Sequence, residues 1–251
     1  MGHITIERDG GIAILRLMRP PANAVDLELA AEMEVAFRSL TSSGGVTAIV
    51  ITGSGSCFSA GLDLKRVPLY GLDEQRAMVG TANRLLGQLY GCPLPVVAAV
   101  NGHAVAAGLI LMLTSDYRVG TNGACKLGLT EGRVGIPFPA VAMLVLQAEV
   151  APHVARVLTL RANNIDPQAA LAWGLLDELQ APAAVVSTAI EVARDLASIP
   201  SEAYARIKQQ LRAATLVRIE ETIAQGTDPA LESWVTSEAA AASAALLRHG
   251  R

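Results

Sequence analysis

The sequence is poor in aromatic residues and in charge. Of its 251 residues only 4% are Phe, Trp or Tyr and 17% are charged, and the formal net charge is −3. Proteins that bind nucleic acid usually carry a basic patch, which this composition does not favour. We therefore expect no nucleic-acid partner.

Cysteine and histidine are also scarce. The three cysteines, Cys57, Cys92 and Cys125, are scattered along the chain, and the four histidines show no metal-ligand spacing. A disulfide framework needs paired cysteines in an oxidising compartment, and a zinc site needs closely spaced ligands. The sequence therefore predicts neither disulfides nor a metal site, and its cysteine usage suits a reducing cytosol.

Long apolar runs are missing as well. The apolar stretch at residues 104–114 is too short to span a bilayer, which takes about 20 residues. The first ten residues carry charges where a signal peptide needs an apolar segment. Because 51% of the residues are nevertheless apolar, the chain can bury a core, and its length fits one domain. We expect a globular cytoplasmic protein with no membrane partner.

The order of apolar and turn residues predicts an α/β chain. Residues 3–8 and 12–18 alternate around an Asp-Gly-Gly turn and predict a hairpin, and Asp26 is placed to cap a helix that runs to Leu40. Strands that alternate with helices in the first half predict a parallel sheet, and the Ala-rich tail must pack on the body or on a neighbouring subunit. Further strands are expected at residues 46–52, 95–100 and 116–119, and helices at 73–90, 104–113, 140–150, 153–160, 167–173, 183–197, 201–214 and 229–247.

Two familiar motifs fail. A dinucleotide fingerprint after the strand at 46–52 would need its third glycine at position 58, which is Phe58. Ser59 lacks one of the two flanking glycines of a nucleophile elbow. A hydrolytic triad of Ser59, His103 and Asp63 stays open as an alternative.

Two small-residue segments carry a stronger signal. They are CFSAGLDL at residues 57–64, which follows an expected strand and loop, and AAVNGHAVAAG at residues 98–108, which spans the end of an expected strand, a turn and the start of a helix. The pair resembles the two oxyanion-hole segments of the crotonase (enoyl-CoA hydratase/isomerase) superfamily, and supporting similarity runs from Ile12 to Leu179. The resemblance implies a spiral of ββα units with two roughly perpendicular sheets and a helical C-terminal region.

The resemblance also implies a substrate and an assembly. The substrate would be an acyl-CoA thioester, with coenzyme A as part of the substrate and no separate cofactor. Residues 1–198 would form the spiral core, and residues 199–251 a helical region for oligomerisation into a trimer or a dimer of trimers. The other substrate-binding positions carried over from the family are Ala24, Ala60, Gly61, Asp63, Leu64, Gly108 and Thr130.

Backbone amides are expected to hold the thioester oxygen. Chemistry beside a thioester generates an enolate, and losing one preorganised N–H donor costs roughly 2.7–4 kcal/mol of barrier. The resemblance assigns the two donors to the amides of Leu62 and Ala107. Ala107 stands where relatives commonly have glycine, which keeps the amide but adds a methyl group.

One carboxylate remains as the catalytic base. Hydratases of the family use two glutamates, and the first of these positions is Ile110 here, whereas the second is filled by Glu131. This pattern resembles mitochondrial-type Δ3,Δ2-enoyl-CoA isomerase, in which one carboxylate moves a proton from C2 to C4. Open alternatives are a hydratase, hydrolase or decarboxylase with an unplaced acid, and a non-catalytic acyl-CoA-binding relative.

The residues on either side of Glu131 predict its environment. Leu129, Ile136, Pro137 and Phe138 are apolar and would raise the pKa of the Glu131 carboxyl towards neutrality. The alternative is that the nearby arginine at position 133 neutralises the carboxylate as an ion pair.

Other polar residues have more general roles. Arg19, Lys65 and Arg66 are candidates for contact with the CoA phosphates. Asp63 is expected to cap a helix that begins there, and His103 to pack in the turn beside the second oxyanion segment.

Overall fold

The computed structural model describes residues 2–249 of the chain, which form an α/β fold with two sheets. The larger sheet has the strand order β1-β2-β3-β5-β7-β9, and only the β1–β2 pair is antiparallel. Its strands are β1 (Ile4–Asp9), β2 (Ile12–Leu17), β3 (Ala48–Gly53), β5 (Val96–Val100), β7 (Tyr117–Thr121) and β9 (Glu178–Gln180).

The first half of the fold follows the sequence closely. The expected hairpin is confirmed, with Ile4 opposite Leu17, and Asp26 accepts a hydrogen bond from the Leu29 N–H (2.9 Å) at the start of α1 (Leu27–Ser42). Every residue of β3 and of β5 is buried, because helices cover both faces of the parallel sheet. The apolar runs therefore identified these strands correctly.

The second sheet implied by the resemblance is present and small, and its individual strands were not predicted. It contains β4 (Cys57–Ser59), β6 (His103–Val105) and β8 (Leu127–Gly128), all parallel. The helix predicted from residue 104 is wrong at its start, because the chain first pairs as β6 and the helix α3 begins at Ala107. Tertiary pairing decides these strands, since two or three residues are too few for a periodic signal.

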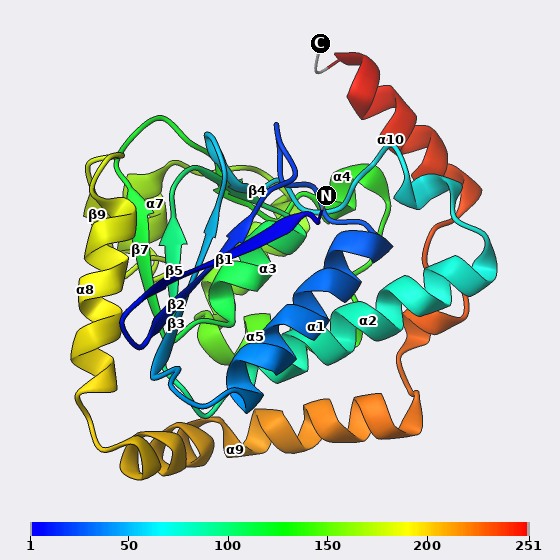
Figure 1. Cartoon of the computed structure of the whole chain (residues 1–251). Helices are drawn as coiled ribbons and strands as arrows, with labels where there is room; N and C mark the ends of the chain where they lie inside the picture. Colours follow the sequence, from blue (N-terminus) through cyan, green and yellow to red (C-terminus); the bar gives the residue numbers. More distant parts are fainter. Residues whose placement is uncertain (1, 250–251) are drawn as a thin grey trace.

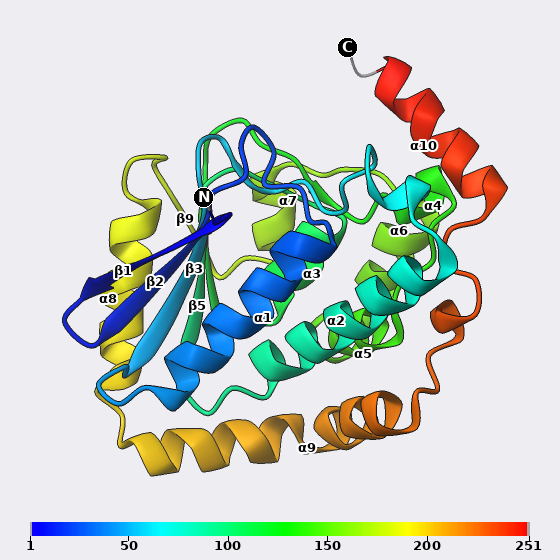
Figure 2. The same cartoon turned by 45° about the vertical axis from the view of Figure 1, so that its right-hand side comes forward.

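Helices cover the larger sheet unequally. α8 (Val185–Ala197) packs against β3, β5 and β7, while α1 and α2 (Leu72–Tyr90) lie side by side on the opposite side (Figures 1 and 2). The remaining elements are η1 (Val67–Leu69), α3 (Ala107–Leu113), α4 (Glu131–Val134), α5 (Ala140–Glu149), α6 (Pro152–Arg161) and α7 (Pro167–Ala172).

The C-terminal region corrects two predictions. The helix expected at 201–214 continues as α9 (Ser201–Gln225), because no breaker occurs before Gly226, whose φ is +59°. The single helix expected at 229–247 is wrong. A short turn, η2 (Pro229–Leu231), is followed by an irregular segment with a turn and bends, and α10 (Ser237–His249) begins later.

Buried charges fasten α9 to the body. Lys208 and Arg212 of α9 both bind the Asp116 carboxylate, at 2.7 and 3.1 Å, and the Arg212 guanidinium lies 4.0 Å from the centre of the Tyr90 ring. Figure 1 shows α9 crossing the lower edge of the molecule, whereas α10 extends outward near α4. Between residues 2 and 249, no helix combines the length and the apolar character that crossing a membrane requires.

Candidate active site

Two glycines bring the small-residue segments into direct contact. Gly61 has a φ of +80°, and a Cβ atom built on it would lie 2.6 Å from the Ala106 Cβ and 2.9 Å from the Ala107 nitrogen. A Cβ on Gly108 would lie 2.2 Å from the carbonyl oxygen of Ser59. No side chain fits at either position, so the turn after β4 and the start of α3 meet backbone to backbone.

The two expected oxyanion amides are unused by the fold. The Val25 N–H donates to the Gly61 carbonyl (2.7 Å) and the Asp63 N–H to the Val25 carbonyl (2.8 Å), which leaves the Leu62 amide between them. Ala107 is the first residue of α3, where helical N–H groups have no intrahelical acceptor. Within residues 2–249 neither amide donates to a protein acceptor, and both residues line the same cavity.

A strained residue precedes the second amide. Ala106 has φ +54° and ψ −129°, a conformation that favours glycine and costs a side chain about 1–3 kcal/mol. The Ala106 N–H donates to the Gly128 carbonyl (2.7 Å), and the Ala106 carbonyl accepts from the Leu109 N–H (2.9 Å). These bonds hold the turn that places Ala107 at the cavity wall.

A buried asparagine fixes the first segment. Asn23 is fully buried, and its side-chain amide donates to the carbonyls of Cys57 (2.7 Å) and Ser54 (3.0 Å). The Ser59 hydroxyl in turn donates to the Asn23 carbonyl (2.9 Å). The loop before α1 and the strand β4 are therefore clamped together beside the glycine contact.

The same contacts argue against the hydrolytic triad. The hydroxyl of Ser59 is occupied by a backbone carbonyl, and His103 Nδ1 accepts from the Lys126 N–H at 3.0 Å. The Asp63 carboxylate binds Arg19 at 2.7 Å and accepts from the N–H of residue 65. Each of the three groups therefore has a structural partner outside the triad. The expected helix at Asp63 is wrong, because the next helical turn is η1 (Val67–Leu69), and Asp63 caps a turn instead.

Glu131 is the first residue of α4 and is 6% exposed. Ile136, Pro137 and Phe138 line the cavity beside it, whereas Leu129 is buried but is not part of the lining. No described residue donates to the Oε2 atom of the carboxyl group. Burial raises the pKa of Glu131 to about 8, and backbone hydrogen bonds at Glu131 and Thr130 act in the opposite direction. The predicted apolar environment of this carboxyl is confirmed.

Arg133 does not neutralise this carboxylate. Its guanidinium donates to the carbonyls of Arg161 (3.0 Å) and Ala162 (3.2 Å) and to Asn163 Oδ1 (2.6 Å). Arg133 therefore ties α4 to the end of α6 and leaves Glu131 unpaired.

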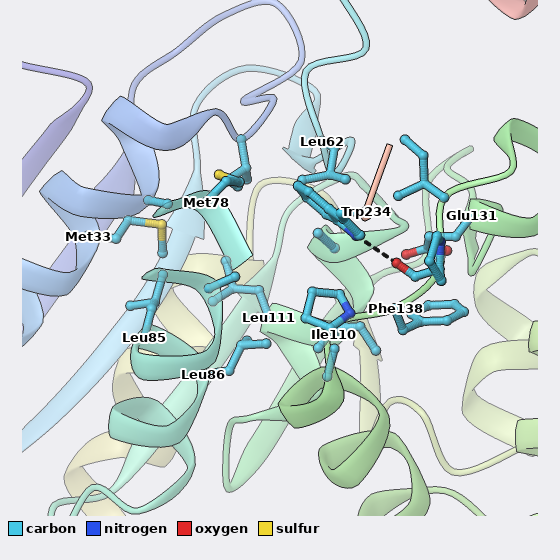
Figure 3. A pocket seen from close by; sticks show the side chains of 18 residues that line it. Met33, Leu62, Met78, Leu85, Leu86, Ile110, Leu111, Glu131, Phe138 and Trp234 are labelled. Atoms are coloured by element: carbon cyan, nitrogen blue, oxygen red, sulfur yellow. Dashed lines mark hydrogen bonds between the residues drawn. The ribbon is translucent and has the colours of Figure 1, made fainter. Parts of the chain in front are cut away.

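An apolar cavity extends from Glu131 into the core. The cavity is open at its mouth, and Glu131 is the only ionisable side chain among the described residues that line it. Ile110, which the resemblance aligns with the first of the two hydratase glutamates, is part of its wall. Figure 3 shows Glu131 on one side of this cavity and Met33 and Leu85 on the other.

Trp234 is a cavity residue that the sequence interpretation missed. It is 1% exposed, lines the cavity and donates its indole N–H to the Pro137 carbonyl (2.8 Å; Figure 3). A lone tryptophan in an otherwise Ala-rich tail was the available signal, because large aromatic residues rarely occur without a packing partner.

A second hollow shares Leu62, Glu131 and Ile136 with the first. Ala60, Leu64 and Thr130, three of the predicted substrate-binding residues, line it. A ligand that reaches from one hollow into the other passes both Leu62 and the Glu131 carboxyl.

The remaining predicted contacts lie around Arg19. Its guanidinium binds the carboxylates of Asp26 (2.9 Å) and Asp63 and donates to the Ala24 carbonyl. Arg66 also pairs with Asp26, whereas Lys65 is exposed at the same edge. Arg19 and Arg66 thus have structural partners, and the assignment of any of the three basic residues to CoA phosphates stays a prediction.

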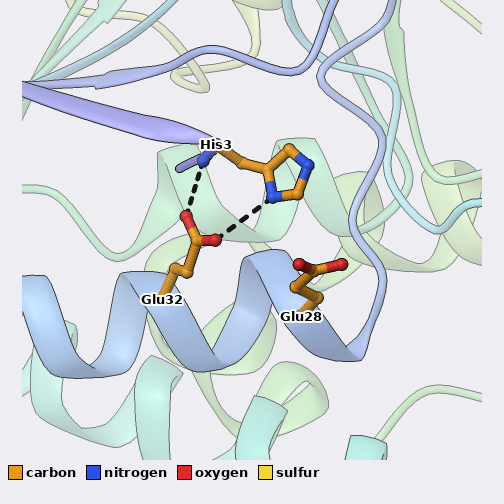
Figure 4. A group of neighbouring side chains, drawn as sticks. All are labelled: His3, Glu28 and Glu32. Carbon is orange, nitrogen blue, oxygen red and sulfur yellow. Dashed lines mark hydrogen bonds and ion pairs between the residues drawn. The ribbon is translucent and has the colours of Figure 1, made fainter. Parts of the chain in front are cut away.

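One cluster of potential metal ligands lies away from this site. His3, Glu28 and Glu32 have ligand atoms within 4.8 Å of one another (Figure 4). Glu32 accepts from the His3 backbone N–H (2.6 Å) and lies 3.2 Å from its ring nitrogen, and Arg66 lies 3.6 Å from Glu28. These contacts account for the cluster as a link between the chain start and α1.

The raised pKa predicts an effect on stability. The folded protein holds the Glu131 proton up to about pH 8, whereas the unfolded chain releases it near pH 4.5, so this residue destabilises the fold increasingly between these two values. We expect Glu131→Gln to raise the free energy of unfolding by a few kcal/mol at pH 9 and by little at pH 4. Urea unfolding across this pH range measures the difference.

The control for that experiment is Glu191→Gln, which removes one negative charge at an exposed position of α8. If Glu131→Gln and the parent protein keep a constant difference in unfolding free energy from pH 4 to pH 9, Glu131 is charged in the folded protein and the burial argument is wrong.

Comparison with known proteins identifies relatives of this arrangement. The sequence model for enoyl-CoA hydratase/isomerase matches residues 7–240. The probable enoyl-CoA hydratase EchA17 of Mycobacterium tuberculosis is 32% identical over 201 residues, which cover 80% of this chain and 77% of that protein.

Solved structures show the same fold. The apo structure of an M. tuberculosis enoyl-CoA isomerase has a TM-score of 0.81 and 30% identity, covering 89% of this chain and 98% of that one. Human mitochondrial Δ3-Δ2-enoyl-CoA isomerase has a TM-score of 0.90 over 98% of this chain and 97% of its own, but at 24% identity it supports the fold alone.

Proposed function

Because the chain belongs to the enoyl-CoA hydratase/isomerase family, we propose that it is a Δ3,Δ2-enoyl-CoA isomerase with Glu131 as its only acid–base group. The observation that carries this proposal is the single carboxyl in an otherwise apolar cavity, with Ile110 in the wall where a second glutamate would be needed. A hydratase must hold and activate water, and this lining has no second group to do so. A proton shift within the substrate needs one base.

The reaction follows from the positions of these groups. The Glu131 carboxylate removes a proton from C2 of a 3-enoyl thioester, and the electron pair is delocalised over C4 and the thioester oxygen. The Leu62 and Ala107 amides donate to that oxygen. The protonated Glu131 then returns the same proton to C4, which gives the 2-enoyl thioester and regenerates the carboxylate. No external proton, oxidant or cofactor is needed.

Burial suits Glu131 to both halves of this reaction. A carboxyl with a pKa of about 8 accepts a carbon-bound proton more readily than one near its usual value, and it remains a usable acid afterwards. The apolar wall also limits the access of water to the dienolate. Water that reached the site would exchange the transferred proton with solvent.

An ultraviolet assay tests the proposal. Purified protein is given trans-3-hexenoyl-CoA in one cuvette and trans-2-hexenoyl-CoA in another. We expect absorbance to rise in the first cuvette as the conjugated thioester forms, and to remain nearly constant in the second. Decay in the second cuvette alone would show water addition and overturn the isomerase assignment.

Assembly remains a separate prediction. The expected trimer, or dimer of trimers, would form through residues 199–251. Support comes from α9, where Ile207 and Leu211 are 61% and 83% exposed.

A further inference from the structure

The helix that carries Glu131 is a single turn. α4 has four residues, Glu131–Val134, and ends at Gly135, whose φ is +67°. Isolated helices shorter than about 12–15 residues are marginal in water, so a turn of this length has little stability of its own. The place of the Glu131 carboxyl in the cavity wall therefore depends on the elements that hold α4.

On one side α4 lies against the end of α6. A Cβ atom built on Gly132 would lie 3.6 Å from the Ala162 Cβ and 3.8 Å from the Thr159 carbonyl oxygen, which is ordinary van der Waals contact. Ala162 ends α6 in a left-handed conformation, with a φ of +48°. The last carbonyl groups of a helix have no intrahelical donor, so α4 meets α6 where backbone acceptors are available.

Arg133 supplies donors to this end of α6. Its guanidinium donates to the carbonyls of Arg161 (3.0 Å) and Ala162 (3.2 Å) and to Asn163 Oδ1 (2.6 Å). The C-terminal end of a helix carries partial negative charge and favours a cation, and the planar guanidinium fixes the direction of its bonds as well as their length. The positive charge that lies two positions from Glu131 is therefore used to hold α4 on α6.

From these contacts we propose that Arg133 is a positioning residue for the proton transfer: it holds α4 on α6 and thereby keeps the Glu131 carboxyl beside C2 and C4 of the substrate. The inference rests on the proposed function for the role of Glu131 as the base. Arg133 acts through α4 rather than on the reacting atoms. A reacting group displaced by about 1 Å can lose about 10²-fold in rate, which sets the size of the expected effect.

Arg133→Ala tests the proposal. We expect kcat for trans-3-hexenoyl-CoA to fall about 10²-fold, and both KM and the affinity for octanoyl-CoA to stay within a few fold of the parent protein. Guanidinium chloride at about 50 mM, far below the molar concentrations that unfold proteins, is expected to raise kcat of the variant at least about tenfold by occupying the vacated site. Sodium chloride at the same concentration should restore nothing.

Two results of this experiment would contradict the proposal. A loss of affinity instead of kcat would show that Arg133, which lines the second hollow, contacts the substrate directly. An absence of rescue by guanidinium would show that the variant is damaged in a way that the clamp on α6 does not explain.

Two further variants make the test specific. Arg194→Ala removes an arginine that ties α8 to β1 through Asp9 and lines neither hollow, so kcat and its response to guanidinium should not change. Asn163→Ala removes one exposed acceptor and keeps Arg133, which covers the case in which Arg133→Ala fails to fold. Its kcat is expected to fall about tenfold at unchanged KM. An unchanged kcat in Asn163→Ala, or losses as large in Arg194→Ala as in Arg133→Ala, would overturn the proposal.

Exchange of the C2 protons separates this inference from the proposed reaction. In D₂O the Glu131 carboxylate takes a proton from C2 of octanoyl-CoA, solvent deuterium replaces that proton, and the carboxyl returns a deuteron to C2, which mass spectrometry detects. This step needs the base but no double bond. Slower exchange in Arg133→Ala, in a protein that does not isomerise trans-3-hexenoyl-CoA, would overturn the isomerase assignment and support the positioning role. Isomerisation at an unchanged rate in Arg133→Ala would support the reaction and overturn the inference.

Discussion

Replacing Glu131 with glutamine is expected to lower kcat for isomerisation by about 10³- to 10⁴-fold and to leave acyl-CoA binding within a few fold of the parent protein. Glutamine keeps the shape of the side chain but cannot accept the C2 proton. Within residues 2–249 no other ionisable side chain lines the cavity and could replace Glu131. The measurement is the rate of conjugation of trans-3-hexenoyl-CoA, with octanoyl-CoA titrated into the same preparation.

The titration is the control for folding, since a misfolded variant would lose both activities. Turnover within tenfold of the parent protein would show that the base lies elsewhere. Loss of turnover with intact binding would separate an enzyme that depends on Glu131 from a binding protein in which this residue is incidental.

Gly61→Ala is expected to lower kcat by at least about 10²-fold, the effect of losing one oxyanion donor. The added methyl group would lie 2.6 Å from the Ala106 Cβ and 2.9 Å from the Ala107 nitrogen, so the two segments must separate. Both donor amides move when this contact opens. Steady-state kinetics with trans-3-hexenoyl-CoA measures the loss.

Gly55→Ala is the matched control. Gly55 has a φ of +67°, close to that of Gly61, but no atom lies within 4 Å of the position that its Cβ would take. Both variants carry a similar backbone cost, which thermal unfolding reports, whereas only Gly61→Ala disturbs the amides. Equal losses of kcat in the two variants would contradict the assignment of the oxyanion site.

The sequence predicts the structure best where a local pattern is long. The hairpin around its Asp-Gly-Gly turn, the β-branched run of β3 and the cap at Asp26 were identified because each depends on neighbouring residues or on one local bond. The apolar flank of Glu131 was readable for the same reason, since Ile136, Pro137 and Phe138 are consecutive and begin five residues after it.

The secondary-structure predictions fail where contacts between segments distant in the sequence determine the structure. β6 has three residues and forms through pairing with β4 and β8, and neither partner is adjacent in the chain. The predicted helix at 229–247 is interrupted because Trp234 is buried against Pro137 and the following residue binds Gln75, which is 160 positions earlier. Helical propensity of an Ala-rich tail carries no information about such contacts.

Residues 228–235 also determine when the cavity wall is completed during synthesis of the chain. A ribosome releases the N-terminal elements first, so α1, α2 and α3 can assemble around Glu131 before Trp234 has been translated. Until residues 228–235 emerge, the apolar groove between these helices lacks one wall and is open to other hydrophobic chains. The wall of the cavity is therefore complete only after residues 228–235 have been translated, and a nascent chain stalled before residue 228 exposes the surface that these residues cover in the folded protein.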